Sequence, residues 1–158
     1  MTKRSGGIRK RIGQVAMVGA VTMIGLVACA AVAHQALMGS NPIPAASEFG
    51  YGPRTSAGGS FTARLGGAQP YRKGRLFSTE VSLVDAQGSP LTGARVAVDG
   101  GMPQHGHGLP TQPRVTAETA PGTYRIDGLK FNMGGWWELK LRVETSSAAD
   151  SVVFNLNL

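Results

Sequence analysis

The chain has 158 residues, 42% of them hydrophobic, which is enough for one domain of ordinary size with tails and excludes a second domain. Its formal net charge is +7, but five Lys and Arg side chains lie in the first eleven residues, and from His34 onward 11 Lys and Arg face 9 Asp and Glu. This small remaining excess does not suit a phosphate-binding surface, so we expect no nucleic-acid partner.

A segment of 22 residues without any charge, residues 12–33, follows the basic start. About 20 apolar residues cross the hydrocarbon core of a bilayer, and a basic flank stays in the cytoplasm. The segment therefore predicts a signal peptide or membrane anchor that exports the rest of the chain. Three outcomes fit its end: lipidation at Cys29, because Leu26–Cys29 resembles a bacterial lipobox; cleavage after Ala33; or a retained span. We expect a membrane-tethered domain in the bacterial cell envelope, on the periplasmic or extracytoplasmic side.

The next segment, residues 34–60, is rich in Gly, Pro, Ser and Ala and shows neither a period of 2 nor one of 3.6. This composition predicts a flexible linker. The chain then divides into a signal peptide or anchor at residues 1–33, the linker at 34–60 and a β domain at 61–158.

Short segments with alternating apolar residues, separated by turn residues, fill the rest of the chain and are typical of an all-β domain. Strands are expected at residues 61–65, 76–85, 94–99, 114–119, 123–127, 136–144 and 152–158. Seven short strands in about a hundred residues predict an immunoglobulin-like antiparallel β-sandwich. Residues 120–124, Ala-Pro-Gly-Thr-Tyr, fit either a tyrosine corner or an ordinary strand tyrosine at Tyr124.

Strand direction predicts where the loops of such a domain gather. Connected antiparallel strands run alternately up and down, so the first, third and fifth strands finish at one end of the sandwich. The loops at residues 66–75, 100–113 and 128–136 should therefore meet there. The residues that we expect to approach one another at this end are Met102, His105, His107, Met133 and Trp136.

The histidines and methionines of these loops suggest a metal site. Thioether sulfur and imidazole nitrogen suit Cu(I), whereas hard ions prefer carboxylates, and no Asp or Glu lies between Gly100 and Arg114. Structural zinc sites use cysteine or more histidine, and the only cysteine is Cys29. The alternative is a rigid, proline-rich loop in which Met102 and Met133 only fill the end of the core. Both interpretations stay open on the residues alone.

Two stretches resemble the YtkA-like domains of bacteria, which are related in outline to the FixH-like proteins. The resemblance covers about residues 76–145, and its specific parts are Met102-Pro103, His105-Gly106-His107-Gly108, Gly122-x-Tyr124 and Met133-Gly134-Gly135-Trp136. It implies a small exported or membrane-anchored protein with an immunoglobulin-like sandwich, associated with copper handling and respiratory oxidase assembly. Any ligand role implied by the family falls on Met102, His105, His107 and Met133.

The sequence does not favour an enzyme, because no carboxylate pair lies near the histidines, the exported part has no cysteine nucleophile, and the serines lack a nucleophile elbow.

The alternative to a copper-binding module is a protein-interaction module that docks on a membrane or periplasmic partner through its loop end. Trp136 should point outward if Trp137 packs inward, which makes it a candidate contact. Residues 72–75, with three basic side chains, form either a solvated turn or a contact for an acidic partner or lipid head groups.

Overall fold

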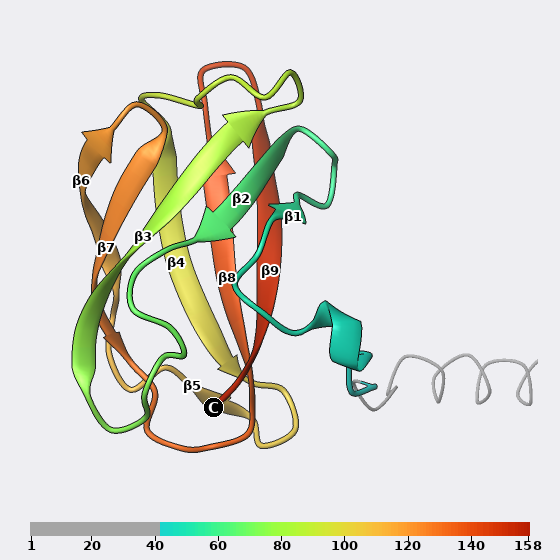
Figure 1. Ribbon diagram of the computed structural model, residues 1–158, viewed down its shortest axis with the longest axis vertical. Helices are drawn as coiled ribbons and strands as arrows, with labels where there is room; N and C mark the ends of the chain where they lie inside the picture. The colour runs from blue at the N-terminus through green and yellow to red at the C-terminus, as the bar shows by residue number, and fades with distance from the viewer. Residues whose placement is uncertain (1–41) are drawn as a thin grey trace, which may run out of the picture. The chain divides into compact units, whose positions relative to one another are not determined.

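The computed structural model describes residues 42–158, which form two antiparallel β-sheets packed face to face (Figure 1). The predicted signal or anchor segment, its three possible ends and the first part of the linker lie outside the described residues. Within residues 42–158, no helix is both long enough and apolar enough to cross a bilayer.

Nine strands and one 3-10 helix make up the described unit. The five-stranded sheet has the order β1 (Arg54–Thr55), β2 (Phe61–Leu65), β3 (Leu76–Asp85), β7 (Thr123–Lys130) and β6 (Arg114–Ala120). The four-stranded sheet has the order β5 (His107–Gly108), β4 (Arg95–Met102), β8 (Trp136–Glu144) and β9 (Ala149–Asn157). The 3-10 helix spans Ala46–Glu48.

All seven expected strands are present, and β2, β3 and β8 have the expected bounds. The all-β, two-sheet prediction is therefore confirmed. The two additional strands, β1 and β5, have two residues each, which is too short for any alternation to be visible in the sequence. Without them, the strand order is the one that constant-type immunoglobulin domains use, with four strands in one sheet and three in the other.

The core lies between the two sheets and is built by alternation, as predicted. Every second residue of β3, β8 and β9 is buried; these residues are Thr79, Val81, Leu83, Trp137, Leu139, Leu141, Val143, Val152, Phe154 and Leu156. Burial of this apolar surface is the main force that holds the sheets together. Trp137, Leu139 and Phe154 are completely inaccessible to solvent.

The segment before β2 is more ordered than its composition predicts. Residues 45–60, assigned to a flexible linker from the sequence, form the 3-10 helix and β1, and Phe49 pairs in parallel with Asn155 of β9. The Phe49 ring also packs edge-on against Trp136, with 6.5 Å between ring centroids. These contacts are possible because Phe49 is a large apolar residue inside an otherwise small and polar stretch.

Trp136 is consequently covered and not exposed, which corrects the sequence-based expectation. It does lie on the face opposite to Trp137, but Phe49 covers it and its side chain is only 8% exposed. Its indole N–H donates to Asn155 Oδ1 at 3.0 Å. Trp136 therefore joins the amino-terminal segment to β8 and β9 and is not available as a contact for a partner.

Tyr124 uses its hydroxyl to fix the connection between β3 and β4. The hydroxyl donates to the carbonyl of Leu91 at 2.7 Å and accepts from the N–H of Ala94 at 2.9 Å. A tyrosine corner bonds to backbone only a few residues upstream, whereas these partners lie about thirty residues away. Tyr124 is thus a strand tyrosine that joins two distant segments.

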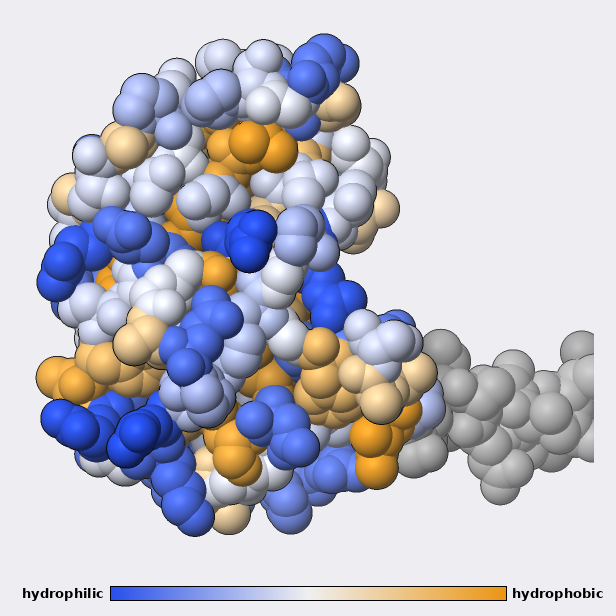
Figure 2. All heavy atoms as spheres, in the orientation of Figure 1, coloured by the Kyte–Doolittle hydropathy of each residue, from blue (hydrophilic) through white to orange (hydrophobic). Residues whose placement is uncertain are grey.

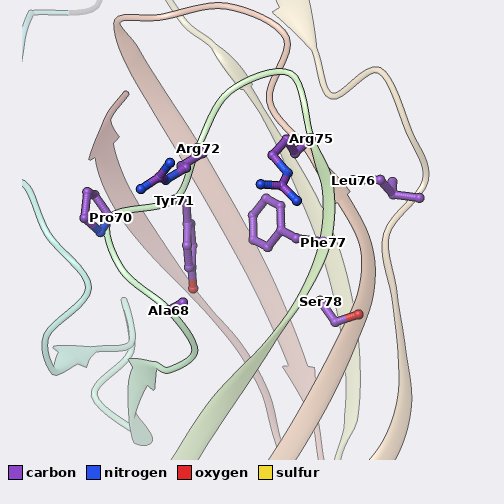
Figure 3. Close-up of a pocket in the computed structure, with 8 residues that line it drawn as sticks. All are labelled: Ala68, Pro70, Tyr71, Arg72, Arg75, Leu76, Phe77 and Ser78. Carbon is purple, nitrogen blue, oxygen red and sulfur yellow. The ribbon is translucent and has the colours of Figure 1, made fainter.

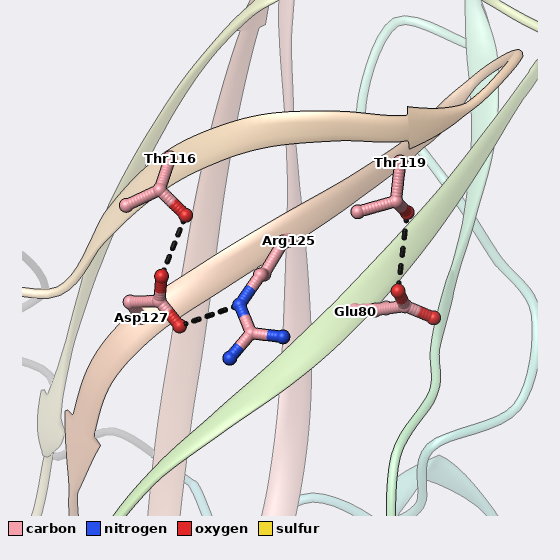
Figure 4. Close-up of polar contacts among 5 residues, drawn as sticks. All are labelled: Glu80, Thr116, Thr119, Arg125 and Asp127. Atoms are coloured by element: carbon pink, nitrogen blue, oxygen red, sulfur yellow. Dashed lines mark hydrogen bonds and ion pairs between the residues drawn. The ribbon is translucent and has the colours of Figure 1, made fainter.

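The outer face of the five-stranded sheet carries polar side chains (Figure 4). Thr116 on β6 donates to Asp127 on β7 at 2.6 Å, and Arg125 Nε donates to the other oxygen of Asp127 at 2.9 Å. Thr119 donates to Glu80 of β3 at 3.1 Å. Hydrogen bonds from Ser78 and Thr116, together with Arg125, lower the pKa of Asp127. This face is a solvated sheet surface, and its exposed ion pair contributes little to stability.

Candidate functional site

Three loops meet at one end of the sandwich, as strand direction predicts (Figure 1). The loop after β2 contacts the loop after β7 through the Gly74 N–H, which donates to the carbonyl of Phe131 at 2.6 Å. The loop after β7 also pairs with the end of β9, because Gly135 and Leu158 exchange two backbone hydrogen bonds of 2.7 and 3.1 Å. We call this region, built from residues 66–75, 100–113 and 128–136, the loop end.

The His105-Gly106-His107 motif lies in a tight hairpin between β4 and β5. Met102 pairs with His107, and the carbonyl of Met102 accepts from the N–H groups of His105 at 3.0 Å and Gly106 at 2.9 Å. Gly106 has a φ of +64°, a conformation that other residues rarely adopt. The positive φ at Gly106 thus allows the chain to reverse between the two histidines.

The two histidines lie next to each other and face solvent. Their ring centroids are 6.3 Å apart, and the ring planes differ by 15°. Both residues are exposed. Residues two apart on a straight strand share a face, but here the chain reverses at Gly106 between the two histidines, and the rings remain nearly parallel across the turn. Each imidazole, when neutral, has one ring nitrogen that can coordinate a metal ion arriving from solvent.

The two methionines have different surroundings. Met102 is 2% exposed and belongs to the core, and a Cβ atom placed on Gly135 would lie 3.3 Å from its methyl carbon. Met133 is 38% exposed, and its carbonyl accepts a 3.1 Å hydrogen bond from the Trp137 indole. The structure therefore brings together His105 with His107, and Met102 with the loop of Met133. Only Met102 fills the core, as the rigid-loop interpretation expects of both methionines.

A hollow of about 220 Å³ lies beside the hairpin, lined by Met102, His107, Asp99, Glu138 and Lys140 among others. Glu138 is not among the residues expected at the site, because it lies inside the strand predicted at residues 136–144, about thirty residues after the histidines. The register of β4 on β8 brings it in, since Gly101 pairs with Glu138. Glu138 is itself paired with Lys140 at 2.9 Å. Over residues 42–158, no three side chains of the His, Cys, Asp and Glu types are grouped closely enough to hold a metal ion.

A second pocket, of about 280 Å³, opens at the same end (Figure 3). Tyr71 and Phe77 form its aromatic side, with ring centroids 4.9 Å apart, and Arg72, Arg75 and Leu76 line its rim. The Tyr71 hydroxyl bonds to Thr79 at 2.7 Å and donates to the carbonyl of Gly66 at 3.0 Å. Burial raises the pKa of Tyr71 to about 12, so this side of the pocket stays neutral.

Comparison with known proteins identifies the family of this chain. No curated protein and no solved structure matches it. A family model described as YtkA-like matches residues 59–142, which is more than half of the chain and includes the hairpin and the loop of Met133. The chain therefore belongs to the YtkA-like family.

Proposed function

We propose that this protein is an exported, membrane-tethered module that binds one Cu(I) ion at the loop end. The observation that supports the proposal is the pair of exposed imidazoles of His105 and His107, 6.3 Å apart on a hairpin. Met133, exposed in the neighbouring loop, is the proposed third ligand. Two imidazoles and a thioether form a donor set that favours Cu(I) over hard divalent ions.

Met102 is left out of this ligand set because its side chain fills the end of the core. A ligand that is 2% exposed would have to leave its packing to reach an ion on the surface. Met102 instead supports the site indirectly, since it is the residue of β4 that pairs with His107. Its predicted role as a ligand is tested by comparing Cu(I) binding in M102L and M133L.

An exposed copper site suits a protein that receives the ion and passes it to another protein. Both imidazoles are exposed on the hairpin, so a partner protein can reach the bound ion from solvent. The family resemblance implies copper handling and respiratory oxidase assembly, and we infer such a non-catalytic role here. The basic start and the apolar residues 12–33 support export and tethering of the domain on the outer side of the membrane.

The test is a competition titration with a Cu(I) chelator of known affinity. Residues 42–158 are the suitable segment, because they contain the whole core and the Phe49 contact with Trp136. We expect one Cu(I) per chain in the wild type and much weaker binding in H105A and H107A. Binding should also weaken as the pH is lowered, because protons compete with the metal for imidazole nitrogen.

The matched control is Q104A, which changes an exposed residue of the same turn without removing an imidazole. It should bind copper like the wild type. If the wild-type domain takes up no Cu(I), or if Q104A loses as much affinity as H105A, the copper site is wrong, and a docking role for the loop end becomes the better proposal.

A further inference from the structure

The loop end also carries basic and apolar side chains that the copper site does not use. Its basic residues are Arg72, Lys73, Arg75 and Lys130, which we call the basic rim. Leu76, which pairs with Lys130 across β3 and β7, is 66% exposed and is the apolar side chain of this group. Figure 2 shows hydrophilic and hydrophobic side chains side by side at the lower end of the molecule, where the three loops lie.

The positive charge of the basic rim is not compensated within the described part of the chain. The salt bridges of residues 42–158 involve Arg125, Lys140 and Arg142, and none involves a residue of the basic rim. No Asp or Glu occurs in residues 66–76 or 128–135. The rim therefore presents an uncompensated positive charge to an anion that arrives from solvent.

The pocket in this rim suits a phosphate group with an apolar neighbour. In Figure 3 the guanidinium groups of Arg72 and Arg75 lie at the rim, beside the rings of Tyr71 and Phe77. Guanidinium groups bind phosphate through paired hydrogen bonds. Leu76, next to Arg75 on the rim, is the most exposed large apolar side chain of residues 42–158.

We propose that the basic rim binds the phosphate of anionic phospholipids, with Leu76 entering the lipid interface, so that the loop end rests on the membrane. Adjacent cationic and apolar side chains are typical of segments that lie in this interface. The proposal goes beyond the proposed function and relies only on its membrane tether, not on copper.

The tether favours a membrane over an acidic protein as the occupant. Phe49 fixes the amino-terminal segment to Trp136, whose neighbour Gly135 belongs to the loop end. Residues 34–45, between the predicted anchor and the 3-10 helix, span at most about 43 Å when fully extended. If residues 12–33 anchor the chain, as the proposed function has it, a linker of this length lets the loop end reach the lipid surface.

The experiment is co-sedimentation of residues 42–158, which lack the tether, with vesicles. We expect binding to vesicles of phosphatidylglycerol mixed with phosphatidylcholine and none to pure phosphatidylcholine. The double variant R72Q/R75Q should bind roughly 25-fold more weakly, since each basic residue near an anionic surface contributes a factor of roughly five. L76S should also weaken binding, although it leaves the charge unchanged.

The matched control is R125Q/R142Q, which removes the same charge from the exposed strands β7 and β8 and should leave vesicle binding largely intact. The proposal is overturned if this control loses as much binding as R72Q/R75Q, because attraction would then depend on net charge alone. It is also overturned if the domain binds inorganic phosphate or polyglutamate but no vesicles. Copper binding is measured separately, so a failure of the copper site leaves this test unaffected.

Discussion

A Cβ atom on Gly101 would lie 2.6 Å from the carbonyl oxygen of His107, closer than real Cβ atoms come. The two arms of the β4–β5 hairpin therefore approach each other at a distance that only glycine permits at position 101. Because His105 and His107 occupy the turn and the second arm, this contact determines where both imidazoles lie.

The first prediction follows for G101A. The added methyl group should displace β5 and separate the two imidazoles, so Cu(I) affinity should fall by roughly tenfold, a loss typical of residues that orient metal ligands. The chelator competition titration measures it. The control is G108A in the opposite arm, where the nearest atom would be 3.9 Å away, and this variant should bind copper normally. Equal losses in the two variants would contradict a specific role for the close contact at Gly101.

The second prediction separates the two methionines. M133L should weaken Cu(I) binding and leave the fold intact, since Met-to-Leu replacements of similar volume usually cost under about 1.5 kcal/mol. M102L should leave copper binding nearly unchanged, because Met102 is buried in the core. Titration and thermal unfolding of both variants provide the measurement. A larger loss of affinity in M102L than in M133L would show that the buried methionine is the ligand after all.

Regular strand geometry predicts part of the site. Antiparallel alternation was sufficient to place the three loops at one end. The same alternation, continued from Val96 and Val98 through Gly100, puts Met102 on the inward face, because β4 runs to residue 102 and not only to the expected residue 99. Glycines interrupt the apolar pattern there, although their lack of a side chain is what permits the close hairpin.

The covering of Trp136 was harder to predict. The sequence places it correctly on the face opposite to Trp137, but burial on that face depends on Phe49, about ninety residues earlier in the chain. Phe49 and Tyr51 are the only aromatic residues in a stretch otherwise typical of a linker. Nothing in local periodicity indicates which distant strand such residues contact, because that contact depends on the tertiary arrangement.

The third prediction concerns Tyr124. Y124F should lower the free energy of unfolding by about 1–3 kcal/mol, because it leaves the Ala94 N–H and the Leu91 carbonyl without their partner in a mostly buried region. Denaturant unfolding measures the change. Copper binding at the opposite end of the sandwich should be unaffected. A stability equal to that of the wild type would mean that water replaces the hydroxyl without cost.

The fourth prediction concerns Asp150, whose carboxylate holds the turn before β2 against the start of β9. Its oxygens accept from the Gly58 N–H at 3.0 Å and from the Ser60 hydroxyl at 2.8 Å. Hydrogen bonds from Ser56 and Ser60, and from the backbone of Gly58, lower the pKa of Asp150 well below its usual value. A carboxyl group with a lowered pKa in the folded state stabilises that state above its unfolded pKa, about 3.9 for Asp, and this contribution is lost as the pH falls toward the folded pKa.

D150N replaces the charged acceptor with an amide of nearly the same shape, so the variant should be less stable than the wild type at pH 7. The difference should shrink when both proteins are unfolded in urea at pH 3, because protonation of the unfolded wild-type carboxyl reduces its advantage. In this variant one carboxylate oxygen becomes an N–H₂ group, which cannot accept from Gly58 or Ser60. The variant therefore also tests whether the turn at residues 56–60 depends on the carboxylate. A stability difference that is the same at pH 7 and pH 3 would show that Asp150 acts through the hydrogen bonds that its two oxygens accept and not through its charge.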